Sequence, residues 1–164
     1  METLTDRFST YFGSDVASAA AKSIGNGAEI EFQIHRTGTE PAETFTFTKK
    51  DGKNAVMPGP ARDPQLVFTM NEPAAHGILE FQSDNVGEIG IHLAKMVIAT
   101  KKPGAEATDR KLDLHFKAGF LTLFSKGYFG VLTSGGAQLA SYLASHGLSG
   151  IGAFKAILSK RKSK

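Results

Sequence analysis

Short stretches in which apolar and polar side chains alternate predict a β-sheet in this chain. Residues 29–35 and 44–49 both alternate in this way, and a period of two places the apolar side chains on one face of a strand. Because only a short turn separates these stretches, they predict a β-hairpin. Asp51 and Gly52 give a tight-turn signal for a second reversal, after which residues 55–57 can form a short third strand.

Residues 63–80 predict a strand that leads directly into a helix. Leu66, Phe68 and Met70 share one side of the strand, as its period of two requires. Asn71 can accept the first free backbone N–H groups of the following helix as its cap. Alternating stretches precede and follow this one, so we expect it to lie within the sheet.

Apolar residues at spacings of three and four predict helices around these strands. Residues 4–23 form the first amphipathic pattern and residues 85–99 form the second. Residues 111–116 alternate again and predict the last strand. Residues 120–131 and 138–146 then predict two further helices.

The length and the charge distribution indicate one domain with a basic end. A chain of 164 residues has the length of a single domain, which we assign to residues 1–150. Residues 151–164 are interpreted as a short amphipathic segment and a basic tail. The net charge of +3 comes from this tail, so it does not indicate a nucleic-acid-binding face.

The basic tail has two interpretations. It is either a solvated end or a peripheral contact with an anionic membrane, since basic residues near such a surface are attracted to it. The residues that would make this contact are Lys160, Arg161, Lys162 and Lys164.

Composition excludes several classes of protein. The chain has no cysteine, which excludes disulfides, thiolate zinc sites and a cysteine nucleophile. No apolar run approaches the roughly 20 residues that span a bilayer. Residues 1–21 lack the long apolar core of a signal peptide. We therefore expect a soluble, cytoplasmic protein.

The polar residues predict no catalytic or metal site. No two of the five histidines recur at the spacing that would bring metal ligands together on a helix. The carboxylates fall on polar strand faces and at helix starts, with no acid–base pair among them. Residues 147–151 are not a hydrolase G-x-S-x-G turn, because Ile151 takes the last glycine position. The sequence thus predicts a protein that is not an enzyme and that needs no cofactor or metal.

Two segments together resemble the sterol carrier protein type 2 (SCP2) domain. One is the hairpin through Lys50-Asp51-Gly52-Lys53 and its continuation into residues 54–56 and 63–70. The other is the alternating stretch 111–119, which a Phe- and Leu-rich helix follows. The resemblance covers residues 4–132. It implies an α+β fold, with a five-stranded, largely antiparallel sheet, helices packed on one face, and a hydrophobic tunnel for lipid. The activity it implies is non-enzymatic lipid binding or lipid transport.

The aromatic residues agree with an apolar core or an apolar cavity. The chain has twelve Phe and no Trp, and a phenyl ring has no polar group to place in water. A stripe of Phe120, Phe124 and Tyr128 follows the last strand at a spacing of four. We expect the tunnel lining to come from the following residues, some of which are ordinary core: Leu66, Phe68, Met70, Ile78, Ile89, Leu93, Met96, Leu112, Leu114, Phe116, Phe120, Phe124 and Tyr128.

The sequence thus predicts a protein that binds or transfers a hydrophobic ligand, whether a lipid, a fatty acyl group or a sterol-like molecule. Two alternatives stay open. The chain could be an interaction module whose C-terminal apolar helices dock on a protein partner, or an enzyme that acts on an acyl substrate in the same cavity.

Overall fold

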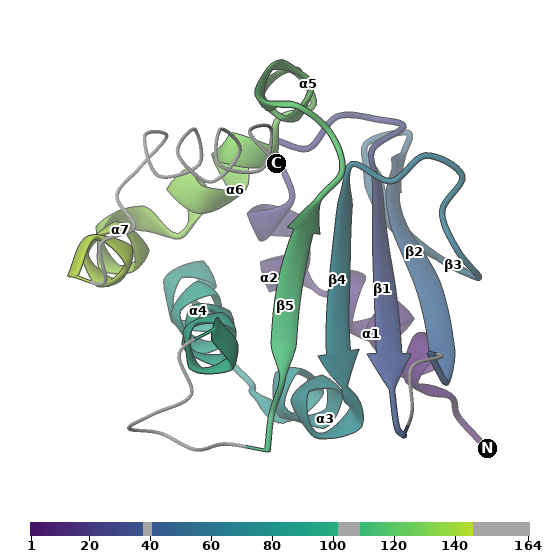
Figure 1. The fold of residues 1–164 in the computed structure, drawn as a ribbon. Coiled ribbons are helices and arrows are strands. Elements are labelled where there is room, and N and C mark those ends of the chain that lie inside the picture. Colours follow the sequence, from purple (N-terminus) through teal and green to yellow (C-terminus); the bar gives the residue numbers. More distant parts are fainter. Residues whose placement is uncertain (38–40, 102–108, 146–164) are drawn as a thin grey trace.

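The computed structural model describes residues 1–37, 41–101 and 109–145. A five-stranded sheet with the strand order β3-β2-β1-β4-β5 forms its centre (Figure 1). Neighbouring strands are antiparallel except for β1 and β4, which are parallel. The predicted α+β class and the largely antiparallel sheet are confirmed. The strands are β1 Glu29–His35, β2 Glu43–Lys50, β3 Lys53–Pro58, β4 Leu66–Asn71 and β5 Leu112–Phe116.

The helices pack on the apolar face of this sheet and extend past its β5 edge (Figure 1). The predicted cap at Asn71 is present, since its side chain accepts a hydrogen bond from the Ala74 N–H. Asn85 precedes α4 and its side chain accepts one from the Glu88 N–H in the same way. The helices are α1 Leu4–Phe12, α2 Asp15–Ala20, α3 Glu72–Glu80, α4 Val86–Lys101, α5 Phe120–Ser125, α6 Tyr128–Ser134 and α7 Gly136–Ser145.

A row of phenyl rings joins three strands on the apolar face. Phe32 of β1 lies in register with Phe45 of β2 and Phe68 of β4. The ring of Phe32 stacks on both neighbours, with centroid separations of 4.8 Å to Phe45 and 5.0 Å to Phe68. Phe8 of α1 packs on Phe45 at 5.0 Å and is almost fully buried. Such pairs add about 0.5–1.5 kcal/mol each beyond the area that they bury, so this row fixes α1 to the sheet.

The opposite face of the sheet is more buried than the alternation of apolar and polar residues predicts. Glu31 and Thr46 point away from the helices, yet both are buried. The chain leaves β3 at one edge and must pass β2 and β1 to reach β4, so residues 59–65 cross this face. The Ala61 N–H donates to the Glu31 carboxylate, and the Thr46 hydroxyl donates to the Gly59 carbonyl. The polar face that the alternation of residues 29–35 predicts is therefore covered at Glu31 and does not face water there.

The single helix predicted over residues 4–23 is two helices. Gly13 ends α1, and Ser14 caps α2 by accepting a hydrogen bond from the Ala17 N–H at 3.3 Å. A spacing of four between apolar residues continues through this break, which is why the pattern did not reveal it.

The helix predicted over residues 120–131 is also broken, at Gly127. This glycine has a φ of 82°, a backbone conformation that side chains disfavour by about 1–2 kcal/mol. It also packs so closely on Ser23 that an added Cβ would lie 1.8 Å from the Ser23 carbonyl oxygen. The stripe of Phe120, Phe124 and Tyr128 is therefore divided between α5 and α6. The predicted segment 151–157 and the basic tail lie outside the described residues.

Gly127 has a positive φ and also packs closely on Ser23, and substitutions can separate these two effects. Gly52 has a similar φ of 76° but no atom within 4 Å of an added Cβ, so Gly52→Ala carries only the backbone cost of about 1–2 kcal/mol. Gly127→Ala adds the collision with Ser23 and should lower the urea midpoint much further. Equal midpoints for the two variants would contradict the close packing of α6 on this loop.

Candidate ligand-binding cavity

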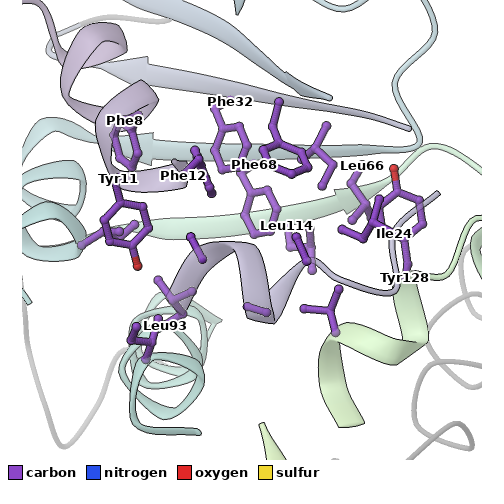
Figure 2. A pocket seen from close by; sticks show the side chains of 18 of the residues that line it. Phe8, Tyr11, Phe12, Ile24, Phe32, Leu66, Phe68, Leu93, Leu114 and Tyr128 are labelled. Carbon is purple, nitrogen blue, oxygen red and sulfur yellow. The ribbon is translucent and has the colours of Figure 1, made fainter. Parts of the chain in front are cut away.

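An apolar cavity of about 270 Å³ lies between the sheet and the helices (Figure 2). Its floor is the apolar face of the four strands β2, β1, β4 and β5. The strands supply these residues to it: Ile30, Phe32, Phe47, Leu66, Phe68, Met70, Leu112, Leu114 and Phe116.

Small side chains on the second helix help to leave this space open. Ala17 and Ala20 of α2 border the cavity, as does Ala21 at the end of the helix. A methyl group cannot reach across to the sheet in the way that Phe8 does from α1. The cavity therefore continues beneath α2 where a Leu or Phe would have filled it.

The remaining wall comes from the helices that follow the strands. Val86, Ile89 and Leu93 of α4 form one side. Leu123 of α5 and Val131 of α6 border the region near the end of β5. Residues from six helices and four strands thus surround one space, and it lies between elements that are far apart in sequence.

The lining offers almost no polar groups. Tyr11 and Tyr128 are the lining residues with a polar side-chain atom, and Figure 2 shows them at opposite ends of the apolar cluster. The Tyr128 hydroxyl donates to Gln65 Oε1 at 2.8 Å, and the same oxygen accepts the Glu29 N–H at 2.7 Å. Burial raises the pKa of both tyrosines. An apolar wall of this kind offers water few hydrogen-bond partners.

These groups do not form a catalytic constellation. Within the described part of the chain, no hydrogen bond joins either tyrosine hydroxyl to a carboxylate or a histidine. Across residues 1–37, 41–101 and 109–145, no group of three or more His, Asp or Glu residues could hold a metal ion. What the arrangement can do is remove apolar surface from water, which favours binding by about 25 cal/mol per Å².

A polar cleft of about 620 Å³ adjoins the cavity. Tyr11, Val16 and Ile89 line both spaces, so they mark the boundary between them. The cleft lies between the first two helices and the segment that joins α3 to α4. Its polar lining residues are Glu2, Arg7, Thr10, Ser14, Asp15, Gln82, Ser83 and Asp84.

The structure brings most of the predicted lining residues to the cavity wall. Met96 does not border the space and is buried in the core instead. The side chain of Phe120 lies outside what the structure describes. The ten at the wall are Leu66, Phe68, Met70, Ile78, Ile89, Leu93, Leu112, Leu114, Phe116 and Tyr128.

The prediction for Phe124 is wrong. Its side chain is 58% exposed and does not border the cavity. The break at Gly127 separates α5 from α6, so the spacing of four from Phe124 to Tyr128 does not place both on one helical face, and Leu123 of α5 borders the cavity instead.

Sequence reasoning missed the contribution of the first two helices. Phe8, Phe12 and Val16 border the cavity, although their spacing of four predicts only the buried side of a helix. The alanines of α2 gave no signal, since an alanine is common in any helix. Whether space remains beside these alanines depends on the elements that lie opposite α2.

Comparisons of the chain with protein-family models, with curated proteins and with solved structures found no match. The SCP2 resemblance therefore stays a prediction. Among the described residues, no helix is long and apolar enough to cross a membrane.

The buried Tyr128 hydroxyl gives a prediction for alkaline pH. Its folded-state pKa is raised above the ordinary value of about 10, so the unfolded chain loses this proton first as the pH rises. The stability that this group contributes is therefore complete below about pH 10 and declines above it. The urea midpoint of the wild type should fall more steeply above pH 10 than that of Tyr128→Phe. Parallel curves for the two proteins would contradict the buried, protonated phenol.

Proposed function

We propose that this protein binds one hydrophobic or amphiphilic molecule in the cavity, without catalysing a reaction. The ligand class is a lipid, a fatty acyl group or a sterol-like compound. The observation that carries the proposal is the cavity itself, which is almost wholly apolar and which no side chain of the described residues fills.

The energetic cost of such a space supports a ligand. Cavities destabilise folded proteins by roughly 24 cal/mol per Å³. A fully enclosed empty space of about 270 Å³ would cost at most on the order of 6 kcal/mol, and this cavity opens into the adjoining cleft, so its cost is smaller. A bound apolar group would restore the missing contacts and offset this cost.

The dimensions favour a slim ligand. Ligand pockets commonly have volumes of about 300–1,000 Å³, and a cavity of about 150 Å³ already holds benzene. The volume here lies near the lower end of the pocket range, so an acyl chain fits more readily than a bulky ring system. A sterol-like ligand would require the helices of the wall to move outward.

The adjoining cleft supports an amphiphile over a pure hydrocarbon. The apolar body would lie over the phenyl row, and the polar end would pass Tyr11, Val16 and Ile89 into the cleft. There it would meet water and polar side chains, so no polar group of the ligand would be buried unpaired. This arrangement accords with the lipid tunnel that the SCP2 resemblance implies, and transfer of the lipid would follow from reversible binding.

The proposal places the protein in the cytoplasm, since a chain without cysteine suits a reducing compartment. An enzyme acting on an acyl substrate in the same cavity would need a polar constellation at the wall, and the two tyrosines do not supply one.

Filling the cavity should separate binding from folding. Ala17→Leu and Ala20→Leu each place a larger side chain in the space, whereas Ala19 on the same helix is exposed. We expect both filled variants to bind a fluorescent fatty acid at least about tenfold more weakly, because they occupy the volume that the acyl chain needs. The urea midpoint of the ligand-free protein should hold or rise, since the cavity cost of about 24 cal/mol per Å³ is reduced.

Ala19→Leu is the matched control and should change neither quantity. Unchanged probe affinity in both filled variants, with midpoints at or above the wild-type value, would contradict binding in this cavity.

A further inference from the structure

Helix α5 has large apolar residues on two sides. Leu123 is 1% exposed and borders the cavity. Leu121 and Phe124 are 79% and 58% exposed on the outer side of the same helix. Single exposed apolar residues are normal at a protein surface, but these two lie three positions apart on one helix and so form one local apolar site.

This helix lies at a defined end of the sheet. Strands β1 and β4 begin at this end, and β2 and β5 finish there. Leu66 at the start of β4 pairs with Ile30 of β1 and with Phe116 at the end of β5. Figure 1 shows α5 above that end, directly after β5. One loop is held beside α5 by a hydrogen bond, and the turn between β2 and β3 is bonded to that loop in turn. The Gly25 N–H donates to the carbonyl of Lys126, the residue after α5, at 2.9 Å. The Gly52 N–H donates to Asn26 Oδ1 at 2.9 Å.

Basic residues outnumber acidic residues at this end. The acidic residues are Glu29, Asp51 and Asp63, and the carboxylate of Glu29 already accepts the N–H groups of Arg62 and Asp63. The basic residues are Lys22, Lys50, Lys53, Arg62, Lys117 and Lys126.

The opposite end of the sheet has no comparable excess of basic residues among the described residues. It carries the start of α1, the start of α3 and the segment before β5. Its acidic side chains are Glu2, Asp6, Glu43, Glu72 and Asp109, and its positive groups are Arg7, Arg36, Arg110, Lys111 and the N-terminal amine of Met1. The excess of basic residues is therefore found at the α5 end.

We propose that the α5 surface, meaning Leu121 and Phe124 with the surrounding basic residues, docks on a membrane that contains anionic lipids. The two apolar side chains enter the boundary between headgroups and acyl chains, and the basic side chains lie over the lipid phosphates. This proposal goes beyond the binding of a ligand in the cavity and does not depend on it. A spread of single basic residues around an apolar tip fits a fluid charged surface better than it fits one fixed set of partner carboxylates.

Vesicle flotation of the full chain tests this proposal. The probe is phosphatidylcholine vesicles with and without phosphatidylglycerol. We expect the wild type to float with the anionic vesicles and to be released by salt, because salt screens the attraction. The double variant Leu121→Ser/Phe124→Ser should bind at least about tenfold more weakly. Met57→Ser is its control, since Met57 is also 51% exposed but lies on β3.

A matched pair of charge-reversal variants tests the contribution of the basic residues near α5. Lys117→Glu/Lys126→Glu should also reduce vesicle binding about tenfold. Lys95→Glu/Lys111→Glu makes the same change of net charge at exposed positions away from α5, and it should reduce binding far less. Because every variant keeps residues 146–164, binding through the basic tail alone would leave all of them equal.

Two results would overturn the proposal. One is equal vesicle binding by the α5 variants and their controls, with unchanged urea midpoints showing that all are folded. The other is a wild type that ignores the vesicles but forms a dimer that Leu121→Ser/Phe124→Ser dissociates, which would assign the α5 surface to a second copy of this chain. Affinity for the fluorescent fatty acid should be unaffected in the α5 variants, so failure here is distinguishable from failure of ligand binding.

Discussion

The stacked phenyl rings of Phe45, Phe32 and Phe68 hold the sheet and its first helix in one arrangement. They lie in register on β2, β1 and β4, so each ring meets the next at about 5 Å. Phe8 then packs on Phe45 and anchors α1. Phe32 and Phe68 of this row border the cavity, so the row forms part of its floor. The cavity exists because α2, which continues from α1 over this floor, presents alanines to it.

The elements of the sheet could be predicted from sequence because burial on one face imposes a period of two. Ile30, Phe32 and Ile34 carry that signal without ambiguity, and all three are buried. The pattern could not reveal that Glu31 is buried too. Its burial depends on a loop that crosses the other face, and that crossing follows from the strand order, which no local pattern contains.

The candidate site was harder to predict because core residues and cavity residues look alike in sequence. Leu93 and Met96 both lie on α4, yet only Leu93 borders the open space. Which of them does so depends on the elements opposite, α2 above all. The prediction that Phe124 lines the cavity was wrong for a different reason. A single backbone conformation at Gly127, set by close packing on Ser23, interrupts the helical spacing that placed Phe124 inside.

The central claim is that the cavity holds one hydrophobic ligand, and native mass spectrometry tests it most directly. The purified full-length chain would be delipidated, exposed to a mixed lipid extract, separated from free lipid and weighed intact. The account predicts a species with one bound amphiphile per chain, whose apolar part is a slim acyl chain when it is released and identified. A folded chain that shows only its own mass after this exposure would contradict the account.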